Sequence, residues 1–286
     1  MSDQDMLPRR GGTGGAPPGR RRNDYTRLGC CGMGNTNIRT LVISLAESAE
    51  RRSLMSERLT KAGLEAEFFD AVNGRTLRRN SRSLWAKAAQ LSDGELGCYL
   101  SHVGVWRKIA DENIPFALVL EDDVDLHGDL ASVCTELAAL PLSFDLVRLS
   151  SLEPQIGKPI RQLANDRTLI LPTKDPFGTQ GYLLSLAGAR RLLSVISEPC
   201  LPIDREFNLY WRHGLQSLLI SPPVVQHDWE LESTIVPTGR AEIVTSLPPL
   251  ARVIRSLQKR RAIYRIFKSV AHKGLFSFIS TSYAHE

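Results

Sequence analysis

Three acidic residues, Glu121, Asp122 and Asp123, directly follow a short apolar segment. This segment, Phe116 to Leu120, comes after Pro115 and predicts a strand that is buried on both faces. Ligands of open α/β sheets bind beyond the carboxyl ends of such strands. Two carboxylates about 4 Å apart repel each other by roughly 4 kcal/mol at an effective dielectric constant of about 20. The sequence therefore indicates either a site for a hard cation, Mg²⁺ or Mn²⁺, or an acidic loop that is solvated.

The segments around these acids alternate between strand and helix patterns. We expect strands at 39–45, 65–71, 116–120, 144–149, 178–185 and 218–221, and helices at 46–62, 92–112, 130–140, 187–196 and 203–213. The helix at 92–112 begins with the spacing of a capping box, Ser92 with Glu95. Such alternation predicts an α/β fold with a mostly parallel central sheet and helices on both of its faces.

The bulk composition is that of a folded α/β protein without a membrane-spanning segment. The chain has 286 residues, of which 42% are hydrophobic and 23% charged, and this suffices for one large domain or two small ones. No apolar segment approaches the roughly 20 residues that cross a bilayer, and we expect no secretory signal at the polar N-terminus. The five cysteines form no CxxC pair, so a reducing cytosol is the expected compartment.

The two ends of the chain differ in composition from its centre. Residues 1–37 are rich in Gly, Pro and Arg, and we expect a disordered, solvated tail rather than a contact with nucleic acid or lipid. Residues 38–247 would form the folded domain, and 248–286 a basic tail. Between Arg252 and Phe278, eight Lys and Arg residues interleave with apolar residues and no acid. This pattern predicts an amphipathic helix that lies on an anionic membrane surface, with packing against the domain as the alternative.

Several blocks, taken in order along the chain, resemble glycosyltransferase family 25. They are residues 41–45 with 50–52, residues 69–74, the block from Leu91 to His102, and the block from Leu118 to Val124. The family includes bacterial lipooligosaccharide galactosyltransferases and collagen galactosyltransferase domains, and the resemblance covers residues 39 to 227. It implies a nucleotide-sugar-binding fold of the GT-A type, a divalent metal, and transfer with inversion at the sugar carbon.

The resemblance gives the acidic segment the role of a metal site. Asp123 is the first expected ligand of Mn²⁺ or Mg²⁺, with Asp122 or Glu121 assisting or holding the ribose. The metal would act as a Lewis acid on the departing diphosphate. His227 is expected to be a further ligand by analogy with GT-A enzymes, and an ordinary loop histidine is the alternative.

Other residues are expected to bind the sugar nucleotide, here a uridine diphosphate (UDP) sugar. Arg51 and Arg52 lie beyond the first strand and could contact the diphosphate or uridine, or simply lie on the helix surface. The segment from Asp70 to Gly74, with Asp70 and Asn73 as its named candidates, is a candidate loop for the base and ribose, or a turn. His102 shares a helix face with Cys98 and Trp106, so it either faces the donor sugar or is a hydrogen-bonded structural residue.

An inverting transfer also needs a base to take the proton of the acceptor hydroxyl. We expect Asp204 in this role, with Asp228 as its rival, although Asp204 could instead cap a helix. Gly181 and Tyr182 are candidates for the acceptor site. Trp229, like Trp211, could stack on a sugar ring or lie in the core.

The expected function is therefore metal-dependent transfer of a hexose to a glycan or glycolipid acceptor. Galactose from UDP-galactose is favoured over glucose, and the cytoplasmic face of a bacterial inner membrane is the expected location. One alternative is a catalytically silent basic module that binds lipid or nucleic acid. Another is a metal-dependent phosphoryl-transfer or hydrolytic enzyme, although the chain has no P-loop sequence.

Overall fold

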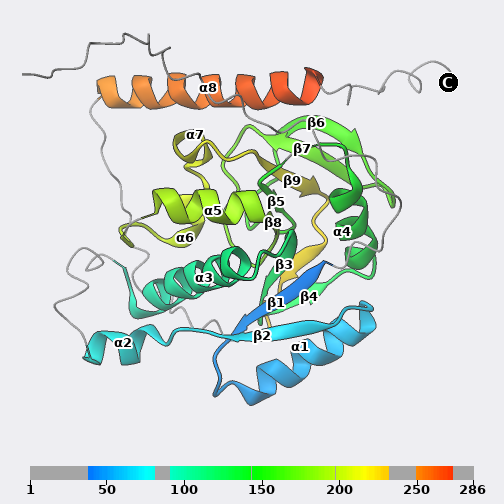
Figure 1. Cartoon of the computed structure of the whole chain (residues 1–286), viewed down its shortest axis with the longest axis vertical. Coiled ribbons are helices and arrows are strands. Elements are labelled where there is room, and N and C mark those ends of the chain that lie inside the picture. The colour runs from blue at the N-terminus through cyan, green and yellow to red at the C-terminus, as the bar shows by residue number, and fades with distance from the viewer. Residues whose placement is uncertain (1–37, 81–90, 143, 197, 232–248, 273–286) are drawn as a thin grey trace, which may run out of the picture. The chain divides into compact units, whose positions relative to one another are not determined.

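The computed structural model describes residues 38–80, 91–142, 144–196, 198–231 and 249–272. The expected N-terminal tail, residues 1–37, lies outside the described residues. The described elements are, in chain order, β1 (Arg39–Ser44), α1 (Ala49–Lys61), β2 (Ala66–Asp70), α2 (Gly74–Asn80), α3 (Asp93–Asp111), β3 (Phe116–Glu121), β4 (Val124–Leu126), α4 (Leu130–Ala139), β5 (Leu146–Arg148), β6 (Gly157–Gln162), β7 (Thr168–Pro172), β8 (Gly181–Ser185), α5 (Leu186–Val195), α6 (Ile203–Phe207), α7 (Tyr210–His213), β9 (Ser217–Ser221), β10 (Val225–His227) and α8 (Pro249–His272) (Figure 1).

The centre of the domain is an eight-stranded sheet in the order β2-β1-β3-β8-β5-β9-β7-β6. Neighbouring strands are parallel across β2-β1-β3 and in the β5-β9 pair, and antiparallel elsewhere. Figure 1 places α3 and α5 on one side of the strands and α4 on the other. The α/β fold predicted from the sequence, a central sheet flanked by helices, is confirmed, and its sheet is mixed in direction.

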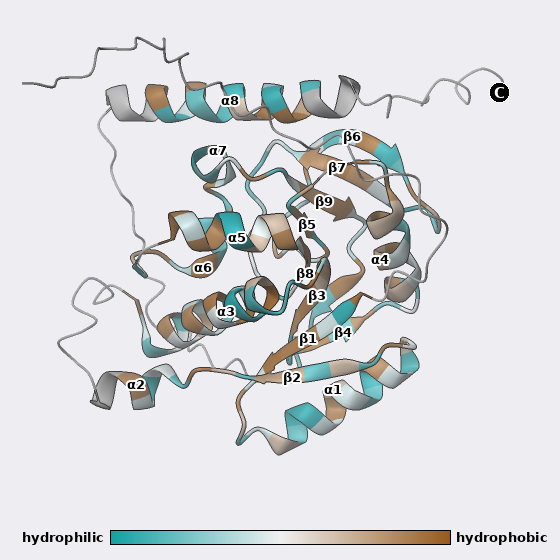
Figure 2. Ribbon diagram, viewed as in Figure 1, coloured by the Kyte–Doolittle hydropathy of each residue, from teal (hydrophilic) through white to brown (hydrophobic). Residues whose placement is uncertain are grey.

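The parallel strands bring their carboxyl ends to one edge of the sheet. In the ladder, Ile43 is opposite Glu121 and Ser44 is opposite Asp70. The residues that follow β1, β2 and β3 therefore meet beyond this edge, as in other open α/β sheets. The inner residues of β1 and β3 are buried, whereas those of β2 are half-buried, and Figure 2 shows the central strands as predominantly hydrophobic.

Helix α3 forms where the sequence signals predict it. The Ser92 side chain accepts a hydrogen bond from the Glu95 backbone N–H at 3.2 Å, and the Glu95 carboxylate accepts one from the Ser92 N–H at 2.8 Å. The capping box is thus confirmed. One face of α3, including Tyr99, His102 and Trp106, is buried against the domain core.

The strands β4, β6, β7 and β10 and the helix α2 were not predicted from the sequence, and two helices were predicted as one. The strands β4 and β10 have three residues each, and β6, at the edge of the sheet, has Ile160 as its one buried residue, so none of these three has a long apolar pattern. Strand β7 is apolar but only five residues long. The helix expected at 203–213 is two short helices, α6 and α7. Helix α7 ends at Gly214, whose φ of 71° is readily reached only by glycine.

Candidate active site

A cavity of about 700 Å³ lies beyond the carboxyl ends of β1, β2 and β3. All three acids of the predicted segment line it, and Asp122 and Asp123 are only 8% and 9% exposed. An exposed acidic loop would leave these carboxylates in water, so the solvated alternative is wrong. Buried carboxylates need positive or hydrogen-bonding partners, and each acid has a different set.

The Asp122 carboxylate is held by two residues of the β1–α1 region. Its Oδ1 lies 2.9 Å from Nη1 of Arg51, and its Oδ2 accepts a hydrogen bond from the Ser44 hydroxyl at 2.7 Å. This ion pair fixes the Arg51 guanidinium at the cavity wall, where it could also meet an anionic ligand.

The Asp123 carboxylate has no such support. Its Oδ1 is buried and has no hydrogen-bond partner among the described residues, and the same holds for Nδ1 of His227. That nitrogen lies 3.9 Å from Oδ2 of Asp123. Burial, followed by the charges of Glu121 and Asp122, raises the pKa of Asp123 to about 7.

The residues present fit a divalent cation at this point. Oδ1 of Asp123 and Nδ1 of His227 are both buried and have no hydrogen-bond partner among the described residues, and this nitrogen lies 3.9 Å from the other oxygen, Oδ2, of the same carboxylate. Both are suitable ligands for a first-row metal such as Mn²⁺. The pairing depends on the ladder between β4 and β10, in which His227 is opposite Val124 and the Asp228 N–H donates to the Asp123 carbonyl at 2.9 Å.

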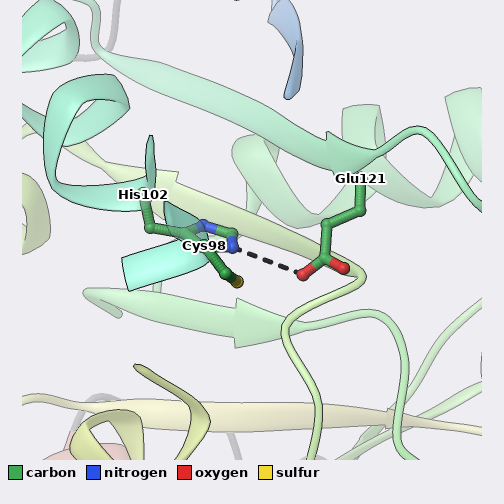
Figure 3. Close-up of side chains that lie close together, drawn as sticks. All are labelled: Cys98, His102 and Glu121. Atoms are coloured by element: carbon green, nitrogen blue, oxygen red, sulfur yellow. Dashed lines mark hydrogen bonds and ion pairs between the residues drawn. The ribbon is translucent and has the colours of Figure 1, made fainter. Parts of the chain in front are cut away.

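The third acid, Glu121, receives hydrogen bonds from α3 and from the segment before β8. Its Oε1 lies 3.3 Å from Nε2 of His102 and accepts a 2.6 Å hydrogen bond from the Thr179 hydroxyl. Figure 3 shows the His102 ring directed at this carboxylate. Burial opposes ionisation, but the hydrogen bond and charge of His102, with Thr179, lower the pKa of Glu121.

His102 is fully buried and both of its ring nitrogens have partners. Because an ionised Glu121 only accepts, Nε2 must carry a proton. Nδ1 lies 2.8 Å from the Tyr182 hydroxyl, which in turn accepts from Trp106 Nε1–H at 3.0 Å. This series of hydrogen bonds, from Trp106 through Tyr182 and His102, holds the Glu121 carboxylate at the cavity wall in one orientation.

Cys98 adds a thiol to this cluster. One ligating atom each of Cys98, His102 and Glu121 lie within 4.8 Å of one another, which is compatible with a metal (Figure 3). Burial and the charge of Glu121 raise the pKa of the Cys98 thiol well above its usual value, which disfavours the thiolate form that metals bind. A metal here would also displace a hydrogen bond of His102.

Of the predicted base-and-ribose loop, Asn73 lines the cavity together with Ala71, Val72 and Gly74. The Asn73 Oδ1 accepts a hydrogen bond from the Thr76 N–H at 3.2 Å, which orients the first turn of α2. Arg52 lies 2.5 Å from Asp70 and donates to the Ser44 carbonyl at 2.9 Å. Arg52 and Asp70 therefore brace the β1–α1 turn rather than line the cavity.

The residues predicted for acid–base and acceptor roles do not line the cavity. Asp204 lies in the first turn of α6, and its negative charge contributes to the raised pKa of Cys98. The Asp228 carboxylate pairs with Arg58, whose hydrogen bond lowers the pKa of Asp228. Gly181 and Tyr182 are buried in β8, where Tyr182 supports His102.

The structure thus brings together seven of the predicted residues at one cavity: Arg51, Asn73, His102, Glu121, Asp122, Asp123 and His227. Trp229 also lines the cavity; from the sequence it was predicted either to stack on a sugar ring or to lie in the core. The Trp229 side chain is 80% exposed at the cavity, and its ring packs edge-on against His227 with centroids 4.5 Å apart. The sequence signal that could have placed Trp229 at the site is its position two residues after the predicted ligand His227.

Comparisons with known proteins identify the family of the chain. The family model described as glycosyltransferase family 25 (LPS biosynthesis protein) matches residues 37–206. Procollagen galactosyltransferase 1-A of Xenopus laevis is 30% identical over 57% of this chain and 29% of its own length. A putative glycosyltransferase of Haemophilus influenzae is 28% identical over 60% of this chain and 62% of its own. The lacto-N-neotetraose biosynthesis glycosyltransferase LgtE of Neisseria meningitidis is 34% identical over 53% of this chain and 58% of its own length.

The chain covers less than two thirds of the length of each of these relatives. In addition, none of the helices in the described ranges has the length and apolar character needed to cross a membrane.

Proposed function

The chain belongs to glycosyltransferase family 25, and on this premise we propose that it transfers a hexose from a nucleotide sugar to a glycan acceptor. Galactose from UDP-galactose is the proposed donor, and transfer proceeds with inversion. The observation that carries this proposal is the buried acidic segment at the cavity, with Arg51 beside it. One oxygen of Asp123 and one nitrogen of His227 there have no hydrogen-bond partner among the described residues.

We propose that Asp123 and His227 hold the divalent metal, Mn²⁺ or Mg²⁺. When bound, such a metal neutralises the charge that develops on a departing diphosphate. Asp122 contributes indirectly, because its oxygens are already engaged by Arg51 and Ser44. Glu121, fixed by His102, is then available to accept a hydrogen bond from a sugar hydroxyl.

The cavity is large enough for a nucleotide sugar. Its volume of about 700 Å³ falls within the range typical of cofactor and substrate sites. Arg51 of α1 and Arg75 of α2 both line it and supply charge for the diphosphate, while Asn73 supplies polar atoms for the nucleoside.

Asp204 is the proposed general base; it does not line the cavity, but its negative charge acts on Cys98, which does. Its rival Asp228 forms an ion pair with Arg58, and a carboxylate whose pKa is lowered in this way is a weak base. The acceptor is proposed to be a lipooligosaccharide or related glycolipid at the cytoplasmic face of the membrane, with the exposed Trp229 ring as a platform for one sugar. Gly181 and Tyr182 would shape the acceptor side from within β8.

A donor screen tests this proposal. The purified protein is incubated with Mn²⁺ and a panel of nucleotide sugars, and hydrolysis and transfer are followed by product analysis. We expect UDP-galactose turnover that Asp123→Asn lowers about 100- to 1,000-fold, since the metal supplies several kcal/mol of transition-state stabilisation. Asp129→Asn, a carboxylate outside the cavity, is the matched control. Full activity of Asp123→Asn, or free phosphate as the only product, would contradict the proposal.

A further inference from the structure

Helix α8 has one face that packs on the domain. Ile266 is buried within the hydrophobic core, and Lys259 pairs with Asp175. The ammonium of Lys158 lies 5.2 Å from the centre of the Phe267 ring. An apolar contact, an ion pair and a cation–π contact therefore hold this face against the domain, and the opposite face of α8 points away from the domain.

The outward face carries an apolar stripe. Val253, Leu257 and Tyr264 are 55%, 49% and 65% exposed. Their spacings of four and seven residues are close to one and two helical turns, so the three side chains lie in one row. Figure 2 shows hydrophobic and hydrophilic residues alternating along α8. An exposed row of this kind is costly in water unless something covers it.

Positive charge surrounds the stripe. Arg260, Arg261 and Lys268 are exposed, and each lies three or four residues from a stripe residue. The helix contains no Asp or Glu along its whole length. A cavity of about 230 Å³ beside the stripe is lined by Lys158, Arg260 and Tyr264, among others, so Lys158 adds one further cationic group there.

We propose that this outward face of α8 docks the protein on an anionic lipid bilayer. Apolar side chains enter the headgroup boundary while flanking cations meet lipid phosphates, which is the arrangement of interfacial helices. A nucleic acid would use the cations but gain little from Val253 and Leu257, the aliphatic part of the row. The inference rests on the proposed function in one respect, because a glycolipid acceptor would be presented at such a surface.

Vesicle sedimentation of the full chain tests the inference. Binding to vesicles of phosphatidylcholine with phosphatidylglycerol is compared with binding to phosphatidylcholine alone and to a DNA oligonucleotide. We expect binding only to the anionic vesicles. The pair Arg261→Gln and Lys268→Gln should weaken it about 30-fold, at about fivefold per cation. Leu257→Ser should weaken it about tenfold through lost apolar contact.

The matched control is the pair Lys61→Gln and Arg107→Gln, which removes two exposed helical cations elsewhere and should leave binding within about twofold. Circular dichroism confirms that the variants fold. Three outcomes would overturn the inference: equal binding to neutral vesicles, equal losses in the two pairs, or tighter binding to DNA that the α8 pair abolishes. UDP-galactose hydrolysis is measured in parallel; its absence with vesicle binding intact would refute the proposed function alone.

Discussion

Replacing Asp123 by asparagine should lower turnover about 100- to 1,000-fold and yet stabilise the metal-free protein. Burial and two neighbouring carboxylates raise the pKa of Asp123 from its ordinary 3.8 to about 7. The folded protein therefore keeps a proton on this group over a pH range in which the unfolded chain has already released it. Under linkage, stability falls as the pH rises from about 4 to about 7.

The size of the effect follows from the shift. Three pKa units at about 1.4 kcal/mol each give about 4 kcal/mol of destabilisation above pH 7, as an upper order of magnitude. Asparagine has nearly the same shape and carries no charge, so Asp123→Asn should recover most of this free energy at pH 8. At pH 5 the gain should shrink to about 2 kcal/mol or less, since the folded state then holds the proton.

Urea denaturation in the presence of a chelator measures this difference. The control is Asp129→Asn, because Asp129 lies 2.9 Å and 3.1 Å from two nitrogens of Arg167, and these hydrogen bonds lower its pKa although burial opposes them. That variant should lose stability at pH 8. If Asp123→Asn is no more stable than the parent at pH 8, or if its gain does not change between pH 5 and pH 8, the assigned burial and repulsion at Asp123 are wrong.

Three further substitutions probe the cavity wall and its support. Arg51→Ala should raise the KM for the donor about tenfold or more through lost charge-assisted hydrogen bonds, as steady-state kinetics would show, and an unchanged donor KM would exclude diphosphate contact. Trp229→Ala should raise the acceptor KM about tenfold while Trp229→Phe retains most of the affinity; equal effects would mean that the ring face is not used. Tyr182→Phe leaves the buried Trp106 N–H and one nitrogen of His102 without a partner, so thermal unfolding should show a loss of about 1–3 kcal/mol, and no loss would show that the hydroxyl is not needed.

The sequence was sufficient for the parts of the fold that depend on local signals. The apolar segment ending in Glu121 is a buried strand, and the Ser92–Glu95 pair begins a helix, because both rest on patterns that span only a few residues. The mixed direction of the sheet could not be predicted in this way. Strand β8 pairs antiparallel with both β3 and β5, and this depends on how a long connection returns to the sheet.

The candidate site shows the same division. Asp122, Asp123 and Glu121 are adjacent in sequence, so their common location was predictable, whereas their different partners were not. Arg51 and Arg52 are neighbours with the same chemistry, yet one lines the cavity and the other braces a turn with Asp70. Neighbouring positions on a helix point in different directions, and only the packing of α1 decides which one faces the cavity.

The short ladder between β4 and β10 has a consequence for how the site assembles. It places His227 against Asp123 although more than 100 positions separate them along the chain, and the family match ends at residue 206, before the histidine. A fragment trimmed to the matched region would keep all three acids but lose their imidazole partner. A cation bound by both Asp123 and His227 would link the segment before β4 to β10. Metal binding would then also stabilise the last strand that the structure describes.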